Sequence, residues 1–425
     1  MSQIPRDLQI SLEKALSANF IAELLTHPVY SLASIINVEF FNAVACRRPM
    51  RIQGQHLHVM LMRIGRRQRL ALVCRSRLSA MLIQKLTRTS SEQQIAVLSR
   101  RHFLGLKKNH SPECSFTLQG HSDWVFSVTI GPSGQCLATT SFCDKNVNLW
   151  LLNADWSAAT CASKLKGHSE SVNAVAFHPS ALYLVSGSSD KTAKLWLLNA
   201  DCSDAVCVST LQGHSECVES VVFHPSAPYL ATGSRDKTAK LWLLNADCSA
   251  ATCVSTLRGH TDSINSVAFH PSAPYIATGS NDKTAKLWLL NADWSAATCV
   301  ATLQGHQHFV RSVAFHPSLP CLATGSWDWT TKLWMLSKDA PKCVFTLQGH
   351  RAGVRSVMFH PFAPYLATVS DDRTTKLWLL NTACTSATCV ATLHGHTSSV
   401  SSVAFHPFAP LIATSSTDKT VKLWH

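Results

Sequence analysis

Short runs of alternating apolar and polar residues recur along the chain from residue 114 to residue 425. A run such as Val218–Phe223 has the two-residue period that is typical of half-buried β-strands. A His-Pro turn, a second short strand and a Thr- or Ser-rich corner ending in Asp follow the run. A third strand then ends in Leu-Trp, so the pattern predicts a repeating unit of short antiparallel strands.

A Gly-His pair begins each of these units, and successive pairs lie 46 residues apart or within two of that number. In every unit the corner Asp precedes the Trp by six residues. Self-similarity at a fixed period of this length is typical of repeat architectures. The seven sets of His, Asp and Trp are His121, Asp144 and Trp150; His168, Asp190 and Trp196; His214, Asp236 and Trp242; His260, Asp282 and Trp288; His306, Asp328 and Trp334; His350, Asp372 and Trp378; and His396, Asp418 and Trp424.

The seven units resemble the WD repeat over residues 114–425. The chain departs from that family after each Trp, where Leu, Met or His425 stands in place of the usual Asp. The resemblance implies an all-β, seven-bladed β-propeller. It also implies that the Gly-His imidazole, a strand hydroxyl, the corner Asp and the indole N–H satisfy one another, because a buried unpaired donor costs roughly 1–3 kcal/mol. The strand hydroxyls expected in these structural sets are Ser186, Thr232, Thr278, Thr324, Thr368 and Thr414.

The last unit contains only three strands, because the sequence ends one residue after Trp424. The stretch Cys114–Gln119 matches the outer-strand stretch Cys299–Gln304 of a later unit. Pairing between residues 114–119 and the strand ending at Trp424 would cover an exposed sheet edge and close the ring. The expected domains are therefore a region at residues 1–110 and a propeller at residues 114–425.

The net charge of +13 is concentrated in the N-terminal region. Residues 1–110 contain 17 Lys or Arg and 5 Asp or Glu, whereas the remainder contains 21 and 20. The cluster Arg63, Arg66, Arg67 and Arg69 favours RNA, an anionic membrane or a nuclear-import receptor as a partner, because clustered cations attract phosphate-rich surfaces. No aromatic side chains are interleaved with this cluster to stack on bases.

Apolar residues at three- and four-residue spacings predict amphipathic helices within residues 7–25 and 70–86, so the basic N-terminal region is expected to be small and mostly α-helical. The stretch Arg69–Arg75, within residues 54–86, resembles the later part of an F-box. It lacks the Leu-Pro opening and the aromatic residue usual in that module. The resemblance implies a substrate receptor of a ubiquitin ligase; a structural cap on the ring is the remaining alternative.

No nucleophile elbow, Gly-rich phosphate loop or His-Glu-x-x-His motif is present, and the repeated His and Asp are dispersed around the expected ring. We therefore expect no enzyme activity, metal or cofactor. The first twenty residues lack a secretory signal, and no uninterrupted apolar segment reaches the ~20 residues of a membrane span. These features favour an intracellular chain, cytoplasmic or nuclear, without a transmembrane segment.

Seven of the 16 cysteines recur six residues before each Gly-His pair, which predicts small buried apolar residues in a reducing compartment. Bridges across single loops, Cys202/Cys207, Cys248/Cys253 and Cys384/Cys389, are the alternative. At another position, in the loop after the third strand, some units have Trp and others have Cys, and the sequence gives no reason for the choice. The residues at this position are Trp156, Cys202, Cys248, Trp294 and Cys384.

The units differ most just after Gly-His and beside the corner Asp, positions that lie on one rim in the WD-repeat family. Units one, five and six place aromatic, Arg and Asp residues there, and aromatic and Arg residues dominate binding hot spots. The alternative is that isolated surface aromatics only pack on their neighbours. We therefore expect a non-enzymatic scaffold or adaptor that binds a protein or peptide on this rim. The predicted partner-binding residues are Trp124, Phe126, Phe309, Arg311, Trp327, Trp329, Arg351, Arg355, Asp371 and Arg373.

Overall fold

The computed structural model describes residues 50–52, 55–57, 112–153, 156–180, 182–337 and 340–425. The chain divides into two units, Met1–Leu98 and Ser99–His425. In the first unit, β1 (Met50–Ile52) and β2 (Gln55–Leu57) form an antiparallel hairpin. The predicted helices, the arginine cluster at residues 63–69 and the F-box-like stretch Arg69–Arg75 lie outside the described residues.

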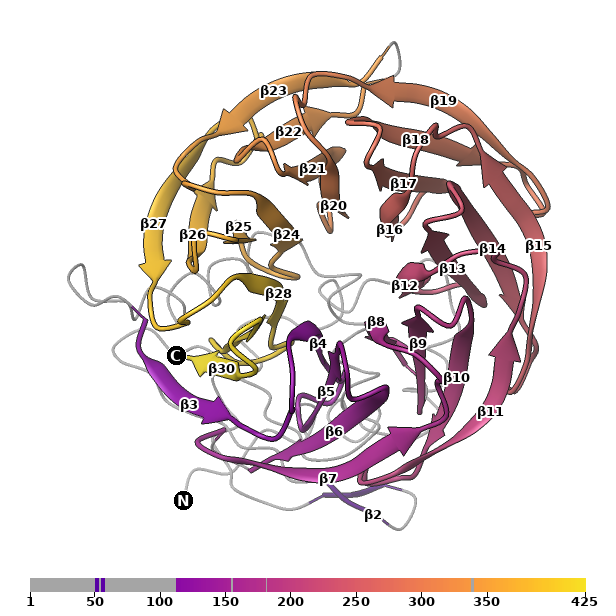
Figure 1. Cartoon of the computed structure of the whole chain (residues 1–425), viewed down its shortest axis with the longest axis vertical. Coiled ribbons are helices and arrows are strands. Elements are labelled where there is room, and N and C mark those ends of the chain that lie inside the picture. The colour runs from indigo at the N-terminus through magenta and orange to yellow at the C-terminus, as the bar shows by residue number, and fades with distance from the viewer. Residues whose placement is uncertain (1–49, 53–54, 58–111, 154–155, 181, 338–339) are drawn as a thin grey trace, which may run out of the picture. The chain divides into compact units, whose positions relative to one another are not determined.

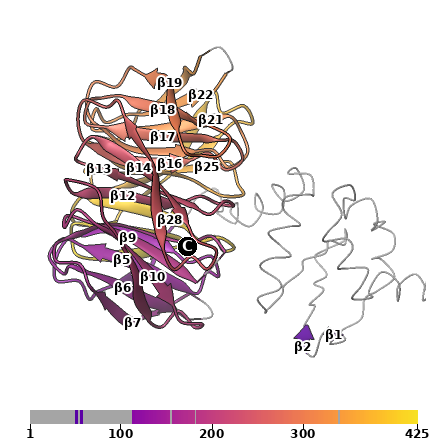
Figure 2. The ribbon, with the colours of Figure 1, turned by 90° about the vertical axis from the view of Figure 1, so that its right-hand side faces the viewer.

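The second unit is a ring of seven four-stranded antiparallel sheets, which confirms the predicted all-β, seven-bladed propeller (Figure 1). Figure 2 shows the same ring from its edge. From the inner strand outwards, blade one is β4 (Val125–Ile130), β5 (Cys136–Ser141), β6 (Asn146–Leu152) and β7 (Ala159–Lys166). Blade two is β8 (Val172–Phe177), β9 (Tyr183–Ser188), β10 (Ala193–Leu198) and β11 (Ala205–Leu211). Blade three is β12 (Val218–Phe223), β13 (Tyr229–Ser234), β14 (Thr238–Leu244) and β15 (Ala251–Arg258).

The remaining blades continue in the same order around the ring. Blade four is β16 (Ile264–Phe269), β17 (Tyr275–Ser280), β18 (Ala285–Leu290) and β19 (Ala297–Leu303). Blade five is β20 (Val310–Phe315), β21 (Cys321–Ser326), β22 (Thr331–Met335) and β23 (Lys342–Leu347). Blade six is β24 (Val354–Phe359), β25 (Tyr365–Ser370), β26 (Thr375–Leu380) and β27 (Ala387–Leu393). Blade seven is β28 (Val400–Phe405), β29 (Ile412–Ser416), β30 (Val421–Trp424) and β3 (Cys114–Leu118).

The hydrophobic core lies between neighbouring blades. One cluster joins Ala231 and Leu241 of blade three to Ile264, Val267 and Trp288 of blade four. Equivalent clusters fill the other junctions, so the second strand of a blade has both faces covered and its residues are almost all buried. The outer strand is covered on one face only, and its residues are mostly exposed or half-buried.

Blade seven is completed by a strand from the start of the repeats. Strand β3 pairs antiparallel with β30, with Thr117 opposite Lys422 and Leu118 opposite Val421. Figure 1 shows β3 beside β30, at the outer edge of the last blade. Leu118 is buried in the cluster that joins blade seven to blade one. The pairing covers the edge that β30 would otherwise expose.

The seven recurrent cysteines are exposed, so the prediction that they are buried is wrong. They lie on outer strands, whose outward face no further sheet covers. Each stands opposite the repeat Trp at a register shift, as Cys253 does opposite Trp242. The Cys253 thiol donates a hydrogen bond to the carbonyl oxygen of Ser255 at 3.6 Å, so the bulged strand contains a bonded thiol rather than a core residue. No disulfide joins the described cysteines, and the three loop pairs are not bridged.

The alternating loop residues after the third strand pack against the preceding blade. Trp294 of blade four stacks on Tyr229 of blade three, with ring centroids 4.5 Å apart. Cys384 of blade six lies instead beside Cys321 of blade five, in one buried cluster. Cys248 of blade three, however, lies in the cluster of Tyr183 of blade two, so both Cys and Trp occur against a Tyr and the structure does not explain the alternation.

The histidine of each Phe-His-Pro turn supports the turn through its ring nitrogen. The N–H groups of Ser226 and Ala227 donate to His224 Nδ1 at 3.1 and 2.8 Å. The ring also packs edge-on against Phe269 of the next blade, with centroids 5.0 Å apart. An Nδ1 that accepts hydrogen bonds must be unprotonated. Burial lowers the pKa of His224, His360 and His406 to about 4.

These histidines predict a loss of stability in mild acid. Because the folded pKa lies below the unfolded value of about 6.5, stability is complete above pH 6.5 and falls as the pH drops towards 4. For His360 alone the loss at pH 5 is about 1–2 kcal/mol. His360→Asn retains an acceptor but not the titration, so its free energy of unfolding should fall less between pH 7 and pH 5 in urea titrations. Equal losses for variant and parent would refute this role.

Candidate functional site

A hydrogen-bonded set of four side chains connects the strands within each blade. In blade four, His260 Nδ1 donates to Asp282 Oδ2 at 2.7 Å. Its Nε2 lies 2.7 Å from Thr278 Oγ1, which accepts the Trp288 indole N–H at 2.8 Å. The same contacts are present in the other six blades. In blade one the hydroxyl comes from Thr139, which was not among the predicted residues.

The groups of this set are paired with one another rather than presented to a ligand. Burial alone would raise the pKa of Asp282, but hydrogen bonds from His260 and Thr284 outweigh it, and the pKa lies below its usual range. Among the described residues, no three His, Cys, Asp or Glu side chains lie together in a way that would hold a metal ion. The geometry of the repeated residues is that of an internal brace in each blade.

A pocket of about 270 Å³ opens on the rim at blades five and six. Two corner loops and the segments that precede β20 and β24 form its wall. The structure thus brings together the predicted residues Trp327, Trp329, Arg355 and Asp371. His308 and Gly353, which also line it, were not predicted as binding residues. In the other units a residue with a side chain stands at the position of Gly353. The missing side chain is the only signal in the sequence that could have indicated this position.

Trp327 is the centre of this pocket. A β-carbon at Gly353 would lie 2.5 Å from Trp327 Cδ1, so the indole rests directly on the glycine backbone. Phe309 packs on the other side, with ring centroids 5.6 Å apart. Among the described residues, the buried Trp327 Nε1 has no hydrogen-bond acceptor. The indole is therefore rigidly placed and has an unused donor.

Two guanidinium groups lie over the Trp327 ring, Arg311 at 5.2 Å and Arg355 at 5.8 Å from its centroid. Arg355 Nε donates to Asp371 Oδ1, whereas Arg311 Nη1 donates to the amide oxygen of Asn265 at 2.9 Å. No carboxylate of the described residues lies within ion-pairing distance of Arg311. The pKa of Arg311 is lowered, mainly because the side chain is buried. The negative charge of Glu219 raises this pKa, whereas the positive charges of Arg355 and Arg235 lower it further. The two guanidinium groups that lie over the indole are thus accompanied by one paired carboxylate, that of Asp371.

The remaining predicted rim residues do not line the pocket, and of these Phe309 and Arg311 contact Trp327 beside it. Arg351 and Arg373 are exposed and do not line it. Trp124 and Phe126 form a separate aromatic cluster with Phe142 in blade one, with ring centroids 5.6–6.5 Å apart. Phe142 lies in that corner, which is one residue longer than in the other units, and it was not predicted as a binding residue. Its side chain is 42% exposed, and that of Trp124 is 47% exposed. Blade one therefore has an aromatic surface of its own.

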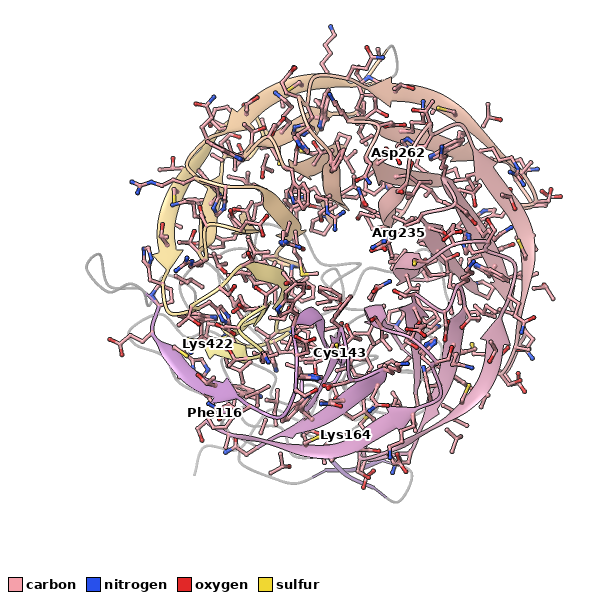
Figure 3. The ribbon with its side chains drawn as sticks, viewed as in Figure 1. Phe116, Cys143, Lys164, Arg235, Asp262 and Lys422 are labelled. Atoms are coloured by element: carbon pink, nitrogen blue, oxygen red, sulfur yellow. The ribbon has the colours of Figure 1, made fainter. Side chains whose placement is uncertain are left out.

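Corner residues lie near the inner side of the ring. Figure 3 shows Cys143 and Arg235, from the corners of blades one and three, towards the middle of the ring. Phe116 of β3 and Lys164 of β7 lie towards the outer edge in the same view. Corner residues of different blades thus lie on the inner side of the ring.

Comparison with known families agrees with this geometry. The WD domain, G-beta repeat family (WD40) matches the chain seven times, at residues 112–150, 159–196, 205–242, 251–288, 297–335, 341–378 and 387–425. A search of curated proteins found no match to this chain. Each matched segment contains one Gly-His pair and one repeat Trp, and together the segments span most of the ring. The chain therefore belongs to the WD40 repeat family.

Proposed function

We propose that this chain is a non-enzymatic scaffold that binds a protein or peptide through the rim pocket of blades five and six. WD40 propellers generally mediate protein–protein interactions and are generally not catalytic. The observation that supports this site is the Arg311–Trp327–Arg355 stack, which occurs at blades five and six in a ring of nearly identical units. Aromatic and Arg side chains in well-packed pockets are typical of binding hot spots.

The contrast with the repeated residues favours the rim. Each repeated His, Asp, hydroxyl and indole has its partner inside the blade, so it offers little to a ligand. In the stack, by contrast, Trp327 Nε1 has no acceptor among the described residues and Arg311 has no carboxylate there. A donor and a charge that the ring does not satisfy favour a partner that supplies an acceptor beside Trp327.

The test compares two triple alanine variants at equivalent positions of two blades. The blade-five variant replaces Phe309, Arg311 and Trp327, and the matched blade-two variant replaces Ser171, Asn173 and Ser189. Affinity purification with quantitative mass spectrometry should recover partners with the blade-two variant as with the parent. Recovery with the blade-five variant should fall by about tenfold or more, since hot-spot truncations cost 2 kcal/mol or more.

Circular dichroism of both variants provides the folding control. Each should melt above the temperature of the purification, because the replaced side chains belong to the rim and not to the buried sets of four. Full recovery of every partner by a folded blade-five variant would contradict the proposed site.

For the N-terminal region we propose a second interaction. Its 17 Lys or Arg against 5 Asp or Glu support binding of RNA or an anionic membrane, and the resemblance of Arg69–Arg75 to an F-box supports the ubiquitin-ligase alternative. No helix of the described residues is long and apolar enough to span a membrane. An intracellular location, cytoplasmic or nuclear, is proposed together with these partners.

A further inference from the structure

We infer that the rim pocket binds the carboxylate of an Asp or Glu side chain from a protein partner, with Arg311, Trp327 and Arg355 as its receptor. The inference rests on the proposed function, because it names the chemistry that the partner brings to the same pocket. Four independent features of the stack support it.

The first feature is charge balance. Arg355 is neutralised by Asp371, and the nearby Glu219 is bound to Arg235 at 2.5 Å. Arg311 is thus the cation of this group without an ion-pair partner among the described residues. One uncompensated positive charge matches a monoanionic carboxylate better than a dianionic phosphate.

The second feature is a surplus of donors. A guanidinium has five N–H donors, and the described side-chain contacts use one from Arg311 and one from Arg355. The indole N–H of Trp327 has no acceptor among the described residues. An ionised carboxylate only accepts hydrogen bonds, and its two oxygens match the forked donors of Arg.

The third feature comes from the chain's own repeats. At the position of Arg311, blades two and four have Asn173 and Asn265, whose amides donate to the carbonyl oxygens of Val218 and Val310 in the next blade. Asn at this position therefore ties neighbouring blades together. Arg311 of blade five also bonds to a neighbouring blade, through Asn265, but it brings a partly buried cation that a tie between blades does not require, since Asn makes such a tie without a charge.

The fourth feature is the apolar surface beside the cation. Trp329 is 56% exposed and lines the pocket with Trp327. Aromatic faces in this arrangement accept an apolar side chain next to the carboxylate and shield its ion pair from water. The favoured ligand is therefore a short segment with an acidic residue flanked by an apolar one.

The experiment selects ligands without assuming a sequence. A random twelve-residue peptide library displayed on phage is panned on the full chain, and the selected peptides are synthesised and measured by fluorescence anisotropy. We expect the selected peptides to share an Asp or Glu at one position. Its replacement by Gln or Asn should weaken binding by about tenfold or more, since charge-assisted bonds are roughly twice as strong as neutral ones.

Two variants that copy residues of other blades test the receptor. Arg311→Asn installs the residue of blades two and four, and Gly353→Ser installs the residue of Ser171 and Ser263, which displaces Trp327. Both should weaken binding by about tenfold or more. Arg373→Asn removes an exposed rim cation outside the pocket and should change binding by no more than about twofold.

The outcomes separate this inference from the proposed function. Both would be overturned if the selected peptides bound the blade-five triple alanine variant as tightly as the parent, or if the library yielded no binder. Peptides that lose binding to that variant but have no fixed acidic residue, or bind Arg311→Asn fully, would overturn the carboxylate assignment alone. Tighter binding when phosphoserine replaces the acidic residue would also overturn it, because the pocket would then match two negative charges.

Discussion

Removal of residues 1–119 is expected to lower the free energy of unfolding of the ring by about 3–5 kcal/mol relative to removal of residues 1–111. The two truncations differ only by the segment that contains β3, so the comparison isolates the closing strand. Without β3, the edge of β30 loses its backbone partners and the cluster at Val421 and Leu423 loses Leu118. An open edge and a cavity of this kind are among the most destabilising changes in a β-protein.

Guanidinium unfolding curves of the two truncated chains measure this difference. The shorter chain should unfold at a lower denaturant concentration and show a greater tendency to associate through the open edge. Coincident unfolding curves would show that the ring closes without β3 and would contradict the pairing of Thr117 with Lys422.

Replacement of Arg311 by Met is expected to separate binding from stability. Binding of the selected acidic peptides should fall by about tenfold or more, while the free energy of unfolding stays unchanged or rises by up to about 1 kcal/mol. Met keeps an unbranched apolar side chain in place of the Arg stem but removes a partly buried cation that lies near Arg355 and Arg235. Loss of the hydrogen bond to Asn265 offsets part of the gain.

Arg235→Met is the matched control for this variant. Arg235 is paired with Glu219, whose side chain is only 12% exposed, so the variant leaves a partly buried carboxylate without its partner. Its free energy of unfolding should therefore fall by about 1 kcal/mol. If urea unfolding shows that Arg311→Met also destabilises the ring, Arg311 has a structural role like that of Arg235.

The fold was predictable because its determinants are local and repeated. The spacing of His260, Asp282 and Trp288 recurs in six units and differs by one residue in the first, and one blade cannot bury its faces alone. The pairing of β3 with β30 was predictable for a similar reason, since residues 114–119 repeat an outer-strand sequence. Patterns of this kind do not depend on knowing which blades are neighbours.

The prediction for the recurrent cysteines was wrong because strand order decides burial. Cys253 has the sequence surroundings of a strand residue, and its exposure follows only from its place on the outermost strand. The contact between Trp294 and Tyr229 joins adjacent blades, at residues that are 65 positions apart in the chain. No single unit contains that information.

The candidate site was predictable in composition but not in geometry. Differences between units pointed to Trp327, Arg311 and Arg355, yet nothing in the sequence indicates that both guanidiniums lie over one indole. The contribution of Gly353 is the absence of a side chain, and that absence matters only once Trp327 rests on it. Phe142 was missed because an inserted residue has no counterpart in the other units.

The division between bracing and binding residues is tested most directly by one ratio. It is the amount of partner recovered by the blade-five triple alanine variant divided by the amount recovered by the blade-two variant, each normalised to folded protein. If the differing residues of blade five hold the partner, this ratio is about 0.1 or less. A ratio near one would show that partners bind elsewhere on the chain, and would contradict the assignment of function to the Arg311–Trp327–Arg355 stack.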